Sequence, residues 1–301
     1  MTLREILARS AKRIEKAAGS WQLAWSEAEL LLSTVLKKDQ TWLVAHNETK
    51  LTSTQKKTFD YLIKRRAKHE PIAYLTGSKP FYGRDFVVTK HVLIPRPETE
   101  ELVELVTHHV TRNTYHQTLI WDVGTGSGAI AVTLKAECPE ATVFASDVDE
   151  RALTVAKRNA KTILKKSSAI HFFKGSLLTP QIEKAILKHT PKHVTIVANL
   201  PYLPLSDKKV LAKDVVSFEP SKALFTKDEG LFLIQELLRQ LAVWLKKEGV
   251  AASIWCEFDP PQANVLKHFA QQLFANASVT IHKDGCSRDR ILSINTKTGG
   301  R

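Results

Sequence analysis

Apolar residues in the first 70 positions recur at the three- and four-residue spacing of amphipathic helices. Thr52 to Gln55 has the form of a capping box, and an apolar stripe at Phe59, Leu62 and Ile63 follows it. Ser26 to Glu29 has the same form ahead of a second apolar run, so we expect another helix to begin there. The pattern predicts a small helical N-terminal domain over residues 1–75.

The pattern changes from Pro71 onward. Residues 81–89 carry aromatic and β-branched side chains around Gly83, which is typical of a β-hairpin. Pro97 then fits the first turn of a helix that runs through Val106. We therefore expect a β-hairpin linker over residues 76–95 and a further domain over residues 96–301.

Short apolar strands alternate with amphipathic helices after residue 115. Such alternation predicts an α/β fold with a mostly parallel, doubly wound sheet. Helices are expected at 129–136, 150–160, 231–245 and 265–274. Seven strands are expected at 118–123, 141–145, 170–173, 195–198, 250–256, 279–282 and 291–294.

The composition is ordinary for a globular protein and excludes several classes. No stretch approaches the roughly 20 apolar residues of a membrane span, so we expect no membrane association. The three cysteines are far apart, and no Cys/His cluster has zinc spacing, so no metal is expected. The basic N-terminus resembles a mitochondrial presequence weakly, but Glu5 and Glu15 favour an ordinary helix. We expect the bacterial cytoplasm ahead of the mitochondrion.

The chain is strongly basic, with a net charge of +13. Residues 1–80 hold 15 Lys and Arg against 8 Asp and Glu, so more than half of the excess lies there. Such a field favours an anionic partner, namely nucleic acid, a ribosome or a protein that works there. Solubility alone is the alternative explanation. The basic run Lys64 to Lys68 is either a solvated helix end or a contact for that partner.

A glycine-rich loop after the strand 118–123 indicates a nucleotide-like cofactor. Asp147 follows at the end of the next strand, where a carboxylate can accept from ribose hydroxyls. The loop fits both a dinucleotide and S-adenosylmethionine. Its residues are Asp122, Gly124, Thr125, Gly126, Ser127 and Gly128.

The run Asn199-Leu200-Pro201-Tyr202 follows the strand 195–198. Asn199 offers an acceptor and two donors, and Pro201 favours an extended Leu200 whose carbonyl can face a ligand. Tyr202 can stack on a planar group. Ligands gather at the carboxyl ends of parallel strands, so the run and the glycine loop meet in one cleft. A grip on a planar NH2 group suits methyl transfer better than hydride transfer, which favours S-adenosylmethionine.

The chain resembles the peptide chain release factor glutamine methyltransferases of PrmC/HemK type. The shared segments lie in order over most of the chain, and the one that contains Ile94-Pro-Arg-Pro-Glu-Thr-Glu100 is the most specific. These segments are Glu70–Gly77, Phe81–Gly83, Val92–Glu100, Asp122–Ile130, Asn199–Tyr202, Phe218–Leu224 and Gly285–Arg290.

The resemblance implies a seven-stranded, Rossmann-like class I methyltransferase domain behind a helical domain and a β-hairpin linker. It implies S-adenosylmethionine as cofactor and class 1 release factors as partners, methylated on the Gln of Gly-Gly-Gln. The Gln amide would donate to the Asn199 side chain and the Leu200 carbonyl, beside Pro201 and under Tyr202.

Other site residues follow from the same resemblance. Asp122 and the glycine loop would face the methionine part of the cofactor, and Asp147 its ribose. Ser176 and Leu177 stand where the family often has an acid and an aromatic residue near adenine. Arg96 and Glu98 would shape the wall of the site, or would form a structural ion pair.

Two alternatives stay open. The family usually has Asn-Pro-Pro-Tyr, and Leu200 in its second position also resembles ribosomal RNA adenine dimethyltransferases. A nucleic-acid adenine N6-methyltransferase, acting on rRNA or DNA, is therefore the alternative function, although residues 70–100 disfavour it. A ribosome-binding protein with a vestigial cofactor fold is the second alternative, which the intact loop, Asp147 and Asn199 disfavour.

Overall fold

The computed structural model describes residues 2–112, 118–165 and 170–297. The chain forms two compact units. The first unit contains Met1–Ser78 and Leu211–Phe218, and the second contains Lys79–Val210 and Glu219–Arg301. No helix of the described residues has the length and the apolar character needed to cross a membrane.

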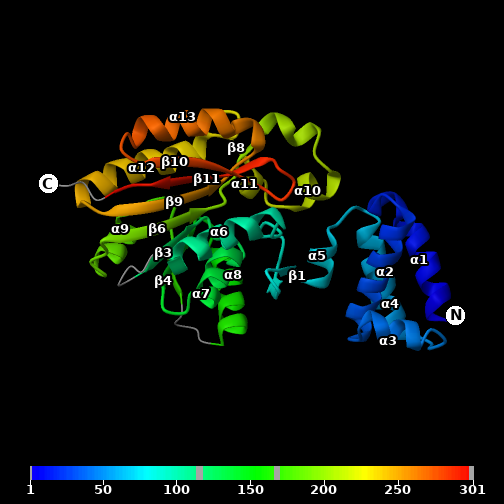
Figure 1. Ribbon diagram of the computed structural model, residues 1–301. Helices are drawn as coiled ribbons and strands as arrows, with labels where there is room; N and C mark the ends of the chain where they lie inside the picture. Colours follow the sequence, from blue (N-terminus) through cyan, green and yellow to red (C-terminus); the bar gives the residue numbers. More distant parts are fainter. Residues whose placement is uncertain (1, 113–117, 166–169, 298–301) are drawn as a thin grey trace. The chain divides into compact units, whose positions relative to one another are not determined.

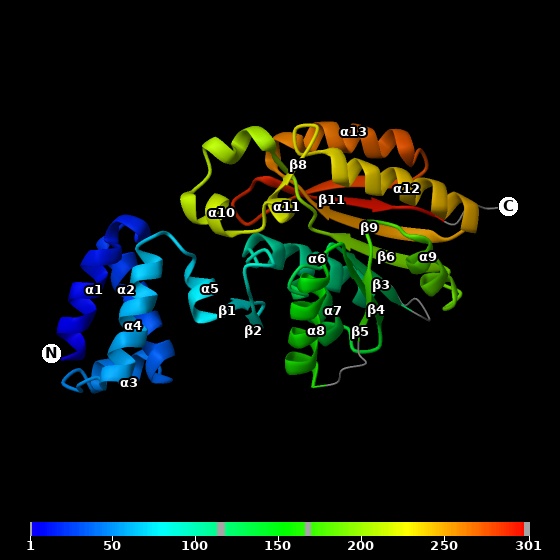
Figure 2. The ribbon, with the colours of Figure 1, turned by 180° about the vertical axis from the view of Figure 1, so that it is seen from behind.

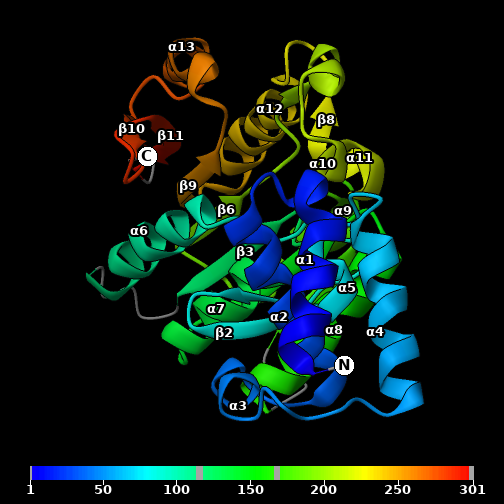
Figure 3. The same cartoon turned by 90° about the vertical axis from the view of Figure 1, so that its right-hand side faces the viewer.

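The first unit is helical. Its helices α1, α2 and α4 pack against one another around a core that includes Leu31, Phe59 and Ile63 (Figure 3). The predicted capping box of α4 is present, since Thr52 and Gln55 bond each other's backbone N–H groups. The helices are α1 (Leu3–Ala18), α2 (Trp21–Leu36), α3 (Gln40–Ala45), α4 (Ser53–Arg66), α5 (Ile72–Thr76) and α10 (Lys213–Phe218).

The helix start predicted at Ser26 is wrong. Helix α2 begins at Trp21, where the Ser20 side chain accepts from the backbone N–H of Leu23. Glu29 bonds the Trp25 indole at 2.7 Å instead of capping a helix. Ser20 has no acid three residues later to complete a capping box, so Ser26 carries the stronger but misleading signal.

The basic run at the end of α4 is partly structural. Arg66 is buried, and its guanidinium donates to both carboxylate oxygens of Glu27, at 2.7 and 2.9 Å. Arg65 pairs with Glu70. Both explanations of the run, a solvated end and a partner contact, are therefore wrong for Arg66, whose charge is neutralised inside the first unit.

A β-hairpin precedes the large sheet. Strands β1 (Ser78–Phe81) and β2 (Arg84–Val87) are joined by Tyr82 and Gly83, both with positive φ, as a two-residue type I′ turn requires. Asn159 fixes the hairpin to the second unit, because its amide bonds both backbone groups of Val87 at 2.8 and 2.9 Å. The same amide also donates to the carbonyl of Ser127 in the glycine loop.

Seven strands form one sheet in the order β10-β11-β9-β6-β3-β4-β5. The five strands from β9 to β5 are parallel, whereas β10 and β11 are antiparallel to their neighbours. The predicted α/β class and seven-stranded sheet are confirmed. The strands are β3 (Leu119–Val123), β4 (Thr142–Asp147), β5 (Ile170–Lys174), β6 (His193–Ala198), β9 (Ala251–Glu257), β10 (Ser278–Lys283) and β11 (Asp289–Asn295).

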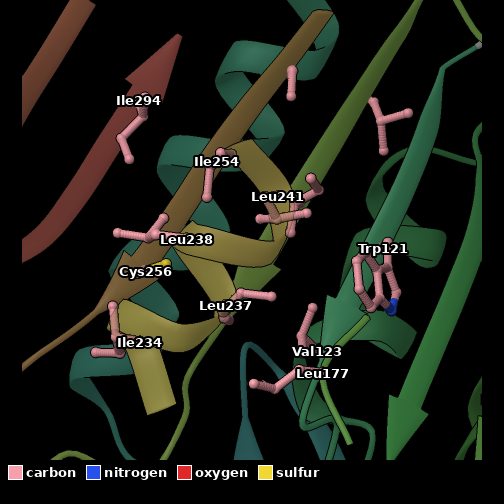
Figure 4. Close-up of a cluster of buried hydrophobic side chains, with 14 of the residues drawn as sticks. Trp121, Val123, Leu177, Ile234, Leu237, Leu238, Leu241, Ile254, Cys256 and Ile294 are labelled. Carbon is pink, nitrogen blue, oxygen red and sulfur yellow. The ribbon is translucent and has the colours of Figure 1, made fainter. Parts of the chain in front are cut away.

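Helices cover both faces of this sheet (Figure 1; Figure 2). Side chains alternate along β3, so that Trp121 packs with α9, α12 and α13 while Ile120 packs with α6, α7 and α8. Figure 4 shows Leu237, Leu238 and Leu241 of α12 over Ile254 and Cys256 of β9. These helices are α6 (Glu98–Arg112), α7 (Ala129–Glu137), α8 (Glu150–Leu164), α9 (Pro180–Leu187), α12 (Phe232–Glu248) and α13 (Ala263–Leu273).

Short elements connect β6 to α12. Strands β7 (Leu203–Pro204) and β8 (Phe225–Thr226) form a separate parallel pair, and α11 (Ser221–Leu224) precedes β8. A 3-10 helix lies at Leu205–Lys209, and a second one follows β9 at Pro260–Gln262. The sequence pattern did not predict these elements, because two to five residues show no period.

Candidate active site

A cleft of the second unit lies at the carboxyl ends of the parallel strands β3 to β6. The segment before α6 and the α11 region complete its wall. The residues that line it are 91–93, 95, 96, 99, 123–127, 129, 130, 147–149, 152, 175–177, 199–201, 220, 222, 223 and 233.

The glycine loop turns sharply from β3 into α7. Gly124, Gly126 and Gly128 all have positive φ, between 56° and 81°. A Cβ at Gly128 would lie 3.1 Å from Ala156 Cβ, so this glycine also permits close packing against α8. Gly124, Thr125, Gly126 and Ser127 line the cleft, whereas Gly128, which was also predicted to bind the cofactor, does not belong to the lining.

Asp122 organises this loop from beneath. Its Oδ2 accepts from the Thr125 hydroxyl at 2.6 Å and from the Ala131 N–H at 3.1 Å. The side chain is fully buried and does not belong to the cleft lining, in contrast to the expectation that it faces a ligand. Burial raises the pKa of Asp122 to about 7, against the opposing effect of its two hydrogen bonds.

Asp147 ends β4 and does line the cleft. Its Oδ2 accepts from the Gly126 N–H at 2.9 Å, and its Oδ1 accepts from the Asp149 N–H at 2.8 Å. Burial raises the pKa of this carboxyl. Each oxygen keeps a further lone pair, so Asp147 can still accept from hydroxyl groups of a ligand. Ser176 and Leu177 lie in the same wall.

The sequence reasoning missed a charged group at the rim. Lys222 lines the cleft, and its Nζ lies 2.5 Å from Asp149 Oδ2. Hydrogen bonds from Arg151 and then from Lys222 hold the pKa of Asp149 well below its usual range. The pair joins α11, which contains Lys222, to Asp149 at the N-cap of α8. In the sequence, only the Phe218–Leu224 motif hinted at a role for the α11 segment.

Asn199, Leu200 and Pro201 line the cleft directly after β6. The Asn199 Nδ2 donates to the Thr99 hydroxyl at 2.9 Å. Leu200 is buried, and its Cδ2 lies 2.9 Å from where a Cβ of Gly124 would stand. Leu200 therefore packs over the glycine loop, and residue 124 has no room for a side chain.

Tyr202 points away from the cleft lining into the second unit. Its hydroxyl donates to Glu257 Oε1 at 3.0 Å, and it packs against the core of the α12 face. Its carbonyl accepts from the Gln262 amide at 2.7 Å. Burial, followed by the charge of Glu257, raises the pKa of this phenol, so Tyr202 stays protonated as a donor.

Arg96 lines the cleft and also forms an ion pair. Its Nη2 donates to Glu219 Oε1 at 2.7 Å, and Glu219 Oε2 accepts from the Ile94 N–H at 3.1 Å. Glu219 thus fixes the segment before α6. Glu98 Oε1 lies 3.7 Å from Arg288 Nη2. Glu98 does not belong to the cleft lining, so the structure does not place it with the other predicted residues.

Thr99 and Glu257 are the polar partners that the sequence did not reveal. Thr99 donates to Glu257 Oε2 at 2.8 Å, and both side chains are buried. They stand 158 positions apart, in a helix and a strand that looked purely structural. Only the fold brings Thr99 beside Asn199 and Glu257 beside Thr99.

Comparisons with known proteins show the family of the chain. Residues 5–77 match the family model described as the PrmC N-terminal domain, and residues 99–199 match the methyltransferase small domain. A release factor glutamine methyltransferase of Bacillus anthracis is 34% identical over 265 residues, which are 88% of this chain and 90% of that protein. The chain belongs to this family. The predicted family resemblance is confirmed.

Other relatives agree with this assignment. The release factor glutamine methyltransferase of Leptospira interrogans is 39% identical over 207 residues, 69% of this chain and 70% of that one. Among solved structures, the hMettl16 catalytic domain in complex with MAT2A 3′UTR hairpin 1 has a TM-score of 0.55 at 16% identity and covers 85% of each chain. That likeness shows the shared methyltransferase fold.

Proposed function

We propose that this protein transfers a methyl group from S-adenosylmethionine to the side-chain amide nitrogen of Gln in the Gly-Gly-Gln motif of class 1 release factors. One observation carries the proposal. Asn199 presents its amide in a cleft that also contains the glycine loop and Asp147. Relatives that align over most of the chain are named for this activity.

The residues of the cleft fit the cofactor. Asp147 offers a carboxylate for the ribose hydroxyls, and Gly126 in the cleft lining has no side chain to keep a ligand from its backbone. Val148 and Leu177 offer apolar walls for adenine. Asp122 would act indirectly, by holding the loop. When bound, S-adenosylmethionine supplies an electrophilic methyl group.

The acceptor needs precise orientation because an amide nitrogen is a poor nucleophile, with its lone pair delocalised into the carbonyl. Its two N–H groups would donate to Asn199 Oδ1 and the Leu200 carbonyl. These acceptors would orient the nitrogen and stabilise the positive charge that develops on it. The nitrogen held by Asn199 and Leu200 would take the methyl group from the bound cofactor, whose sulfur would keep the electron pair of the former S–C bond, and would then release a proton.

The roles of the remaining predicted residues are narrower. Pro201 would hold Leu200 extended, and Arg96 would shape the wall through Glu219. Tyr202 would support the site through Glu257, because its hydroxyl is committed there. The helical domain of residues 1–75 would recognise the release factor, with residues 76–95 as linker and residues 96–301 as the catalytic domain, in the bacterial cytoplasm.

The competing function is adenine N6-methylation of rRNA or DNA, because adenine also presents an NH2 group. The two functions are separated by incubating the protein and labelled cofactor with release factor, ribosomal RNA or duplex DNA. We expect label in the release factor. Label in nucleic acid alone would overturn the proposal.

A further inference from the structure

A chain of hydrogen bonds runs from the cleft into the interior of the second unit. Asn199 Nδ2 donates to Thr99 Oγ1 at 2.9 Å, and Thr99 Oγ1 donates to Glu257 Oε2 at 2.8 Å. The chain joins the segment after β6 to two elements, since Thr99 lies in the first turn of α6 and Glu257 ends β9. Thr99 is 4% exposed and Glu257 is 1% exposed, so the bond between these two residues is shielded from water.

The protons of this chain have one consistent direction. A hydroxyl carries a single proton, and Thr99 donates it to Glu257 Oε2. The Thr99 proton therefore points to Glu257, and Thr99 has only lone pairs left for Asn199. A flipped Asn199 amide would place its oxygen against those lone pairs. The NH2 group must face Thr99, which leaves Oδ1 free for another donor.

Glu257 also holds the other end of the same segment. The Tyr202 hydroxyl donates to Glu257 Oε1 at 3.0 Å. One buried carboxylate thus fixes residue 199 through Thr99 and residue 202 directly. Burial raises the pKa of Glu257, while the bonds from Thr99 and Tyr202 and the charge of Arg290 oppose that rise.

We propose that Thr99 is a positioning residue for methyl transfer: anchored by Glu257, its hydroxyl holds the Asn199 amide with Oδ1 turned toward the nitrogen that accepts the methyl group. The inference rests on the proposed function for the identity of the acceptor. It adds two residues, from α6 and β9, to the machinery of the site. The orientation of the Asn199 amide then also depends on Glu257, which acts on it through Thr99.

Substitutions of Thr99 test this role. Thr99→Val removes the hydroxyl at nearly constant shape, so kcat should fall roughly tenfold. This loss is smaller than the ~10²-fold loss expected when a residue in direct contact with the substrate is removed. KM should change little, because the loss falls on orientation in the transition state. Thr99→Ser keeps the hydroxyl and should restore most of kcat. Thr107→Val is the matched control, since that hydroxyl, also on α6, is buried and has no hydrogen-bond partner among the described residues.

A double-mutant cycle decides whether Thr99 acts through Asn199. In an Asn199→Ala background, Thr99→Val should cause almost no further loss of kcat. An undiminished further loss would overturn the inference and assign Thr99 its own substrate contact. Melting temperatures identify any variant that fails to fold, and Thr99→Ala then replaces Thr99→Val. The four kcat values of the cycle are measured with whichever acceptor the wild-type protein methylates. A failure of the release factor proposal can therefore be distinguished from a failure of the Thr99 proposal.

Discussion

Asn199 is the residue on which the proposed chemistry depends most directly. Asn199→Ala should lower turnover on a release factor by on the order of 10²-fold or more, because it removes a preorganised acceptor. Asn264→Ala, at an exposed position of α13, is the control and should be near wild type. Steady-state assays with labelled cofactor measure both. Near-wild-type turnover by Asn199→Ala would remove this residue from the mechanism.

Gly230 packs closely against the backbone of Tyr202, in the segment that follows Asn199. It has a φ of 83°, and a Cβ there would lie 1.9 Å from the Tyr202 carbonyl oxygen. Gly230→Ala should therefore cost roughly 3–5 kcal/mol of unfolding free energy, from the left-handed backbone and the overlap together. Gly249→Ala shares the positive φ but has nothing within 4 Å, so it should cost only about 1–2 kcal/mol. Urea unfolding compares the two, and equal losses would show that the contact with Tyr202 is unimportant.

At the residue scale, sequence reasoning found the groups that stand in motifs. Asn199 and Asp147 follow apolar strands, and that context placed them at one edge of the sheet. It could not find Thr99 and Glu257, because a buried hydrogen bond between residues 158 positions apart leaves no local pattern. It also placed Asp122 in the cleft, whereas this carboxyl turns inward to the loop backbone.

At the element scale, β6 carries a titratable group in the interior. His193 begins this strand, and burial lowers its pKa to about 4, with the charge of His109 adding to the shift. In the unfolded chain its pKa is about 6.5, so the unfolded state binds the proton first as the pH falls. Stability should therefore decrease from about pH 6.5 to pH 4, by up to about 3 kcal/mol from this residue.

His193→Gln tests that prediction. The variant keeps a polar group near Ser253, which bonds His193 at 3.0 Å, but cannot take up a proton in this range. Its unfolding free energy should decrease less than that of the wild type between neutral and mildly acidic pH. Parallel pH profiles of the two proteins in urea unfolding would contradict the assignment.

The long elements were predictable and the short ones were not. The central strands β3, β4, β6 and β9 are runs of mostly buried residues between turn signals, and the amphipathic helices keep a clear period. Strands β7 and β8 have two residues each and are defined by pairing across the fold. Helix α2 shows the limit for boundaries, since its Ser20 cap is a weaker pattern than the unused box at Ser26.

At the scale of the whole molecule, the net charge of +13 should act on the encounter with the partner. Salt screens such a field, so KM for an intact acidic release factor should rise with ionic strength while kcat stays constant. A short uncharged peptide with Gly-Gly-Gln is the control and should show no such rise. A KM for the intact release factor that does not depend on salt would leave solubility as the explanation of the net positive charge of this chain.

The family assignment covers both units of the chain, the helical unit as well as the unit that contains the cleft. The family model for residues 5–77 and the relatives that span most of the chain tie the helical unit to the same activity class. Leu200 departs from the usual motif, but its side chain is buried over Gly124. We therefore expect the departure to leave the proposed grip on the Gln amide intact.

The site of methylation tests the central claim most directly. A class 1 release factor is incubated with the protein and S-adenosylmethionine, digested, and analysed by tandem mass spectrometry. We predict one added methyl group on the side chain of the Gln in Gly-Gly-Gln, and none when Asn199→Ala replaces the wild-type protein. An unmodified Gln, with methyl groups found instead on adenine in RNA or DNA supplied in parallel, would contradict the account.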